Sequence, residues 1–203
     1  MKSSKRHWDR IFKDTEDQKL GWYEDDVAPT LSLLKKIPIR KKVFISGVGT
    51  SLLIDQLLAE GTSLILNDIS HTALDKVKIR HKEQEHEITF LCQDVSMPIQ
   101  HKTASADVWI DRAVLHFLTD EDDIKGYFNN LNNILKAGGY AIFAEFSKDG
   151  ATECAGLTLH RYSVEELSEK LGNTFELIES FNHTYFNPNG ETRPYIYALY
   201  KKN

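Results

Sequence analysis

The sequence has few cysteines, and they form no recognisable pattern. Its two cysteines, Cys92 and Cys154, lie far apart, and neither belongs to a C-x-x-C pair. A disulfide framework and a zinc site are therefore not indicated, and we predict no metal site. We expect both side chains to be free thiols, as in proteins of a reducing compartment.

Basic clusters and long apolar runs are also missing. The net charge is −5 at pH 7, and basic runs are as short as residues 40–42, so attraction to a phosphate backbone is not expected. No apolar run approaches the roughly 20 residues that span a bilayer, and the charged residues 1–10 do not resemble a signal peptide. We expect a cytoplasmic protein, a monomer or weak dimer, that binds neither nucleic acid nor membranes.

A regular alternation of segment types is the main positive feature. The chain has 203 residues, of which 41% are hydrophobic and 27% are charged, a composition typical of one globular domain. From Val43 onward, short β-branched runs alternate with longer amphipathic segments, which predicts an α/β fold with a mostly parallel sheet between two helical layers. We expect strands at 43–46, 63–67, 88–92, 107–111, 140–146, 175–181 and 195–200, and helices at 52–59, 72–81, 122–135 and 164–171.

The end of the chain differs from this alternation. No helical pattern separates the strand-like segments 175–181 and 195–200. A parallel return needs a crossover of about a dozen residues, so the two strands should form an antiparallel hairpin around the N-P-N-G turn at 187–190. With no repeat or linker in view, we predict a single domain over 1–203, in which an N-terminal arm and helix (1–37) precede the core (43–203).

The stretch 43–51, V-F-I-S-G-V-G-T-S, predicts a strand, a glycine turn and the start of a helix. Glycine is needed in such a turn because a side chain would block the close approach of main-chain N–H groups to a ligand. Taken alone, the turn is equally compatible with a structural role.

Acidic residues stand at the ends of the next three expected strands. Asp68, about 20 residues beyond the first glycine, has the spacing at which an acid binds ribose hydroxyls, although an acid there can also cap a helix, and Ser70 competes for that role. Asp94 can accept a hydrogen bond from an adenine amine or close a turn before Pro98. Asp111 ends the fourth strand, beside the glycine turn.

The N-terminal arm is rich in aromatic residues. Trp8, Trp22 and Tyr23 precede the glycine turn in a polar setting. Such side chains most often fix an arm to the body of a protein, and they can also form a flap over a pocket.

The order of these features resembles the class I S-adenosylmethionine-dependent methyltransferases, which have a Rossmann-like fold. The resemblance covers about residues 8–201 and includes the K-A-G-G run at 136–139. The segments at 107–119 (D-V-W-I-D-R-A-V-L-H-F-L-T) and 146–162 are similar to a bacterial subgroup of generic methyltransferase-domain proteins. The resemblance implies a three-layer, doubly wound sheet of order 3-2-1-4-5-7-6 and S-adenosylmethionine as the cofactor.

The same resemblance assigns roles to single residues. It implies that the glycine turn passes beneath the methionine portion of the cofactor, that Asp68 holds the ribose, that Asp94 faces the adenine, and that Asp111 lies near the methionine ammonium. The candidate cofactor-binding residues are Gly47, Val48, Gly49, Ser51, Asp68, Ile69, Asp94, Val95 and Asp111.

One departure from the family pattern concerns the strand before the turn. The family usually has an acid two residues before the first glycine, where this sequence has Ile45, and Ser51 stands in place of a third glycine. The missing carboxylate would have attracted the positive end of the cofactor, and our hypothesis is that Asp111 compensates in part.

Methyl transfer asks mainly for alignment and exclusion of water, because the sulfonium methyl group is already a strong electrophile. A base is needed only if the acceptor arrives protonated, and His116 is the first candidate because its ordinary pKa lies near neutrality. Tyr23 and Arg112 are further catalytic candidates at the pocket mouth. A packed histidine and a structural arginine ion pair are the alternatives.

Three functions from different classes remain open. The first is transfer of a methyl group to a small molecule or a protein side chain. The second is an NAD-dependent oxidoreductase, which would share the glycine turn and Asp68 but not the closing hairpin. The third is a non-catalytic protein that binds S-adenosylmethionine, which Ile45 makes plausible.

Overall fold

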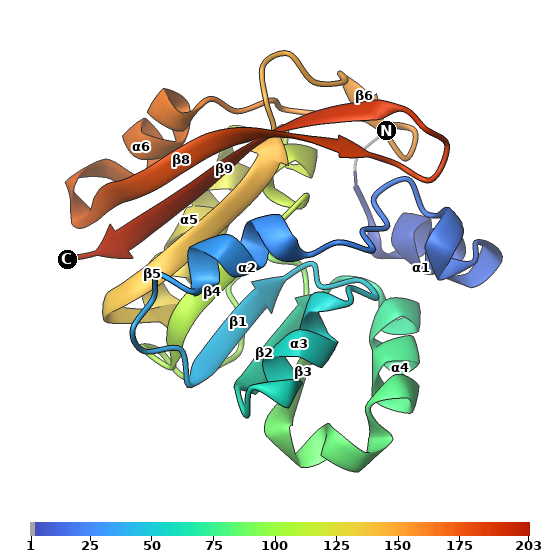
Figure 1. The fold of residues 1–203 in the computed structure, drawn as a ribbon, viewed down its shortest axis with the longest axis horizontal. Coiled ribbons are helices and arrows are strands. Elements are labelled where there is room, and N and C mark those ends of the chain that lie inside the picture. Colours follow the sequence, from blue (N-terminus) through green and yellow to red (C-terminus); the bar gives the residue numbers. More distant parts are fainter. Residues whose placement is uncertain (1–2) are drawn as a thin grey trace.

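One mixed sheet of seven strands runs through the molecule (Figure 1). In this computed structural model, which describes residues 3–203, the strand order is β3-β2-β1-β4-β5-β9-β8. Counted along these seven strands, this is the order 3-2-1-4-5-7-6, so the predicted fold class is confirmed. The strands are β1 (Lys42–Ser46), β2 (Ser63–Asp68), β3 (Ile88–Cys92), β4 (Ala106–Arg112), β5 (Leu135–Phe146), β8 (Phe175–Phe186) and β9 (Thr192–Lys202).

The strand directions follow from the connections. Strands β1 to β5 pair in parallel, whereas β9 is antiparallel to both β5 and β8. The turn between β8 and β9 is closed by Asn187, whose Oδ1 accepts from the N–H groups of Asn189 and Glu191 at 3.0 and 2.9 Å. The predicted C-terminal hairpin is therefore confirmed, and it places β9 next to the central strands.

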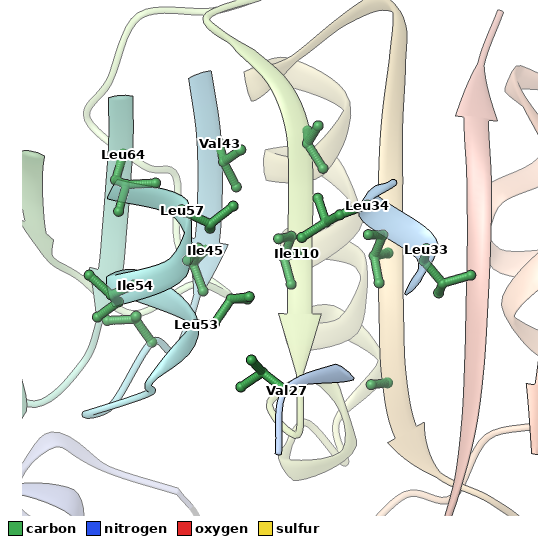
Figure 2. Close-up of a cluster of buried hydrophobic side chains, with 14 of the residues drawn as sticks. Val27, Leu33, Leu34, Val43, Ile45, Leu53, Ile54, Leu57, Leu64 and Ile110 are labelled. Atoms are coloured by element: carbon green, nitrogen blue, oxygen red, sulfur yellow. The ribbon is translucent and has the colours of Figure 1, made fainter. Parts of the chain in front are cut away.

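Helices α2 (Ala28–Leu34), α3 (Leu53–Ala59) and α4 (His71–Arg80) pack on one face of the sheet. Figure 2 shows Leu57 beside Val43 and Ile45 of β1, and Leu34 beside Ile110 of β4. Each fully buried leucine stabilises the fold by about 1.5–3 kcal/mol relative to an exposed one. This apolar layer fixes the carboxyl ends of β1 and β4 relative to each other.

Helices α5 (Glu121–Ile134) and α6 (Val164–Leu171) cover the opposite face. The apolar cluster beneath these helices includes Trp109 of β4, whose ring stacks on Phe44 at a centroid distance of 4.1 Å. The indole Nε1 of Trp109 donates to the hydroxyl of Tyr127 at 2.9 Å, so the buried polar atom is satisfied. Because side chains alternate along a strand, Ile110 and Arg112 point to the other face from Trp109 and Asp111.

Several elements differ from the expectations. The N-terminal arm begins with a helix, α1 (Lys5–Asp14), capped by Ser4, whose Oγ accepts from the N–H of His7. Strand β5 starts at Leu135, because the K-A-G-G run continues the strand through Gly138 at a positive φ of 73°. A small hairpin of β6 (Glu153–Cys154) and β7 (Leu157–Thr158) follows β5. Short 3-10 helices are η1 (Asp17–Lys19), η2 (Lys82–Glu87), η3 (Leu115–Phe117) and η4 (Gly172–Thr174).

Over residues 3–203, no helix combines the length and the apolar character that a membrane crossing requires.

Candidate functional site

A pocket lies at the carboxyl ends of β1, β2 and β4, beneath the N-terminal arm. This is the edge where doubly wound sheets bind their ligands. Its lining combines main chain from the glycine turn, side chains that follow β2, β3 and β4, and aromatic side chains of the arm. The candidate residues in the lining are Tyr23, Gly47, Val48, Gly49, Ser51, Asp68, Ile69, Asp94, Val95 and Arg112.

The glycine turn has the strained geometry that only glycine adopts cheaply. Gly47 and Gly49 have φ values of 51° and 52°, in the left-handed region. A Cβ on Gly47 would lie 2.2 Å from Cγ2 of Val114, and one on Gly49 would lie 3.2 Å from the ring of Phe12. The turn is thus enclosed between the loop that follows β4 and the arm.

Asp68 ties the turn to the second strand. Its Oδ2 accepts from the N–H of Gly49 at 2.8 Å, and its Oδ1 accepts from the N–H of Ser70 at 2.7 Å. Ser70, not Asp68, caps α4, because its Oγ accepts from the N–H of Ala73. Each carboxylate oxygen can accept a second hydrogen bond, and burial raises the pKa of Asp68 to about 6. At neutral pH, Asp68 is an ionised acceptor in the pocket wall.

The polar atoms of the lining fit a nucleoside that carries a charged amino acid. Asp94 holds its own loop, since its Oδ1 accepts from the N–H and the Oγ of Ser96 at 2.9 and 2.8 Å. The Oγ of Ser46 is buried in the pocket wall, with no hydrogen-bond partner among residues 3–203. The carboxylate of Asp68 can accept from ribose hydroxyls, and Gly47 and Gly49 have no side chains to keep a ligand from the main chain, so the residues present fit S-adenosylmethionine.

Asp111 and His116 are not in the lining, which corrects the expectation that they contact ligand or substrate directly. Both side chains are fully buried; Asp111 lies on the same face of β4 as Trp109, and His116 belongs to η3. The Oδ1 of Asp111 accepts from the N–H of Val114 at 3.0 Å, and the Nδ1 of His116 lies 2.6 Å from Oε2 of Glu145. Burial lowers the pKa of His116 to about 3, so it is a neutral, inaccessible imidazole and is not placed to act as a base.

Arg112 lies in the pocket but is engaged by the arm. Its Nε lies 2.8 Å from Oε2 of Glu24, and its Nη1 donates to the carbonyl of Trp22 at 3.1 Å. The guanidinium also lies over the rings of Tyr185 and Tyr195, 5.2 and 5.6 Å from their centroids. The structural alternative for Arg112 is therefore supported: it fastens the arm to the end of β4.

Tyr23 lies between Trp22 and Glu24, the two residues that Arg112 contacts, and it lines the pocket. Its carbonyl accepts a hydrogen bond from the hydroxyl of Tyr185, so the main chain at Tyr23 is also fixed to the C-terminal hairpin. Of the three catalytic candidates, Tyr23 is the one whose side chain lines the pocket without a hydrogen bond or ion pair to another side chain or to the main chain within residues 3–203.

The first helix of the arm docks on α4 through Asp9, a residue that was not among the candidates predicted from the sequence. The Oδ1 of Asp9 accepts from the Oγ of Ser70 at 2.8 Å and from the N–H of Thr72 at 3.1 Å. Burial opposes ionisation, but hydrogen bonds from Lys5, Ser70 and Thr72 lower the pKa of Asp9 to about 2. A negative charge at the N-terminus of a helix is favourable, so Asp9 holds α1 over the pocket.

Aromatic rings complete the cover. Trp8 of α1 packs edge to face against Trp22 and Phe117, with ring centroids 5.4 and 4.9 Å apart. Phe12 lies in the same cluster, next to Gly49. The spacing of Trp8, Ile11 and Phe12 along one helical face was the signal from which this helix could have been predicted.

Comparison with known proteins gives a match in the region of the pocket. Residues 45–143 match the methyltransferase domain family. An eEF1A lysine and N-terminal methyltransferase from Danio rerio is 30% identical over 122 residues, which are 60% of this chain and 18% of that protein. The chain spans about a fifth of the length of the curated relatives it matches.

Solved structures share the fold at low sequence identity. The N-methyltransferase NodS from Bradyrhizobium japonicum, in complex with S-adenosylhomocysteine, has a TM-score of 0.69 and 17% identity, and the match covers 97% of this chain and 98% of that one. A 1,6-didemethyltoxoflavin-N1-methyltransferase from Burkholderia thailandensis, also with bound S-adenosylhomocysteine, has a TM-score of 0.70 and 18% identity, over 87% of this chain and 77% of that one. The family match across the glycine turn and central strands, together with the shared fold, supports a class I S-adenosylmethionine-dependent methyltransferase.

Proposed function

We propose that this protein transfers the methyl group of S-adenosylmethionine to a nucleophile on a small molecule or a protein. The observation that carries the proposal is the pairing of Asp68 with Gly49, at 2.8 Å, inside a pocket at the carboxyl edge of the sheet. It couples the acid suited to ribose hydroxyls to the glycine turn that would lie beneath the rest of the cofactor.

The residues that would hold the cofactor are those of the lining. The main chain of Gly47, Val48, Gly49 and Ser51 would lie against the methionine portion, Asp68 and Ile69 against the ribose, and Asp94 and Val95 against the adenine. When bound, S-adenosylmethionine supplies an electrophilic methyl group, so the protein has mainly to align the acceptor and exclude water.

The aromatic cover is suited to water exclusion. Trp8, Trp22 and Phe117 lie over the pocket, with Tyr23 at its mouth. The Tyr23 hydroxyl is the group that we propose to meet the acceptor. Because the two solved structures named above are N-methyltransferases by name and the curated relative is a lysine and N-terminal methyltransferase, a nitrogen nucleophile is the first acceptor class to test.

Calorimetry tests the cofactor assignment. We expect S-adenosylhomocysteine to bind with one-to-one stoichiometry and NAD to give no heat of binding. Binding of NAD alone would exclude the methyltransferase assignment and favour the oxidoreductase alternative.

Turnover distinguishes an enzyme from a binding protein. A labelled methyl donor should be incubated with amines, thiols, small carboxylic acids and cell lysate protein, and transfer of label is the expected result. A protein that binds S-adenosylhomocysteine but labels none of these acceptor classes would support the non-catalytic alternative, to which Ile45 points.

Four sequence-based expectations are also part of the proposal. The chain forms one methyltransferase domain over 1–203, acts as a monomer or weak dimer, resides in the cytoplasm and does not bind nucleic acid. Its acidic net charge of −5 supports the last of these.

A further inference from the structure

An arginine at the end of α4 contacts the carboxyl side of the glycine turn. Arg80 is the last residue of α4, and its Nη1 and Nη2 donate to the carbonyl oxygens of Thr50 and Ser51 at 3.0 and 2.8 Å. The helix dipole alone favours a base in the last turn of a helix. It does not explain why two nitrogens of one guanidinium bind successive carbonyls of a segment 30 and 29 residues away in the chain.

The two carbonyl groups belong to the turn and not to the helix that follows it. Helix α3 begins at Leu53, so the carbonyls of Thr50 and Ser51 precede its first helical residue. Both residues line the pocket, whereas Arg80 does not. A trans peptide group directs its C=O and N–H to opposite sides, so a fixed Ser51 carbonyl also fixes the N–H of Leu52, another residue of the lining. Arg80 therefore orders main chain of the pocket from outside it.

Asp68 and Arg80 hold the turn with opposite chemistry. Asp68 accepts from the N–H of Gly49 at 2.8 Å, and Arg80 donates to the carbonyls of the next two residues. Hydrogen bonds to charged groups are stronger than those between neutral groups. Three successive residues, 49–51, are thus fixed through their main chain in a sequence that has Ile45 in place of the usual acid.

The guanidinium of Arg80 is itself held in place. Its Nε donates to Nε2 of His81 at 2.9 Å, and its Nη2 lies 3.5 Å from Oδ2 of Asp55, in α3. The His81 side chain is only 4% exposed, so its ring is fixed by packing. Because a guanidinium is planar and can only donate, a fixed acceptor at Nε sets the direction of the two nitrogens that reach the turn.

We propose that Arg80 is a positioning residue that, oriented by His81, holds Thr50 and Ser51 in the conformation that receives the cofactor. The inference rests on the proposed function in that S-adenosylmethionine is the ligand of the turn. It gives the ordering role that Ile45 cannot fill to Arg80 and not to Asp111, which lies outside the lining.

Two substitutions separate the charge of Arg80 from its shape. Arg80→Met removes every donor, and we expect the affinity for S-adenosylhomocysteine, measured by calorimetry, to fall by about tenfold. Arg80→Lys keeps the charge but cannot reproduce the planar fork, so we expect a loss of about threefold. Lys78→Met is the matched control and should leave the affinity unchanged, since Lys78 is a base on the same helix whose Nζ lies over the ring of Phe90.

A role that is exercised through Arg80 predicts non-additive effects for His81. His81→Phe keeps a buried ring and removes the acceptor for Nε. We expect the affinity to fall by about threefold when Arg80 is present and to show no further loss when Arg80 is already Met. An equal loss in both backgrounds would mean that His81 does not act through Arg80, and it would overturn the proposal.

Amide hydrogen exchange gives a readout that needs no ligand. In Arg80→Met, exchange should increase over residues 49–53 while residues 63–68 of β2 stay as protected as in the wild type. Three results would overturn the proposal: an affinity of Arg80→Met equal to that of the control, full affinity in Arg80→Lys, or weaker binding with unchanged exchange. A wild type that binds no S-adenosylhomocysteine would contradict the proposed function, while exchange over residues 49–53 would still decide whether Arg80 holds the turn.

Discussion

Asp68 accepts from two main-chain N–H groups at once, one from the glycine turn and one from the start of α4. Through these bonds one carboxylate sets the distance between β1 and β2 at the edge where the ligand would lie. Its charge is available only above its pKa, which burial raises to about 6. At the residue scale, the protonation of Asp68 should therefore control binding.

The affinity for S-adenosylhomocysteine should increase as the pH rises through about 6 and level off above it, because the ionised form of Asp68 is the better acceptor for ribose hydroxyls. Calorimetry between pH 5 and 8 measures this dependence. In Asp68→Asn the step near pH 6 should disappear and the affinity at neutral pH should fall by about tenfold. An identical step in the variant would show that another group titrates.

The two glycines of the turn give a second test at this scale. In Gly47→Ala the new Cβ would meet Val114 at 2.2 Å in addition to the strain of a φ of 51°. Gly61→Ala is the control, since Gly61 has a φ of 74° but no atom within 4 Å of an added Cβ. Urea unfolding should show a loss of about 1–2 kcal/mol for the control and a clearly larger loss for Gly47→Ala. Equal losses would mean that the Val114 side chain moves aside at no cost in stability.

At the scale of elements, the arm is the part whose position matters most. It is fixed at one end by Asp9 on α4 and at the other by Arg112, which holds Glu24 and the carbonyl of Trp22. These contacts join segments that are 61 and more residues apart in the chain. The arm is therefore held in place by tertiary contacts, and α1 docks through a contact with Ser70, at the start of α4.

Loss of Arg112 should release the arm. In Arg112→Met, Glu24 remains buried without its partner, and urea unfolding should show a loss of about 3–5 kcal/mol. Amide exchange should rise over residues 20–27. The double variant with Glu24→Gln should recover part of the stability, because the unpaired charge is gone. Failure to recover any stability would assign the effect to the lost contacts with Tyr185 and Tyr195 instead.

The central elements could be predicted from the sequence because their apolar patterns are strong. The strand β4, with Val108 and Ile110 on one face and Trp109 on the other, is an example of such a pattern. By contrast, α1 has only a narrow apolar stripe, and its main tie, Asp9 to Ser70, is made across the fold. No local pattern encodes a contact of that kind.

Only part of the candidate site could be predicted from the sequence. Asp68 and the glycines lie close together in the pocket, as their spacing indicated. Asp111 has the same position at a strand end, but it points away from the pocket, with Trp109. Alternation along β4 contained that information, since Arg112, its neighbour, faces the pocket. Glu145 lies within an apolar run and gave no signal, because its partners become adjacent only when β4 and β5 pair.

At the scale of the whole molecule, a ligand that bridges β1, β2 and the arm should stabilise all of them together. A ligand that binds the native state alone raises the free energy of unfolding by about 2.7 kcal/mol when its concentration is one hundred times Kd. For a chain of this size, the midpoint of thermal unfolding should then rise by about 5–11 °C with S-adenosylhomocysteine. NAD at the same concentration should cause no shift. A shift with NAD and none with S-adenosylhomocysteine would contradict the cofactor assignment.

The aromatic cover has an optical consequence. Of the three tryptophans, Trp8 and Trp22 belong to the arm, whereas Trp109 is fully buried against Phe44 in the core. In a Trp109→Phe protein, all indole emission would therefore originate from the arm. Rapid mixing with S-adenosylhomocysteine would then report changes in the surroundings of the arm in real time, with no added dye, as a change in the protein's own fluorescence.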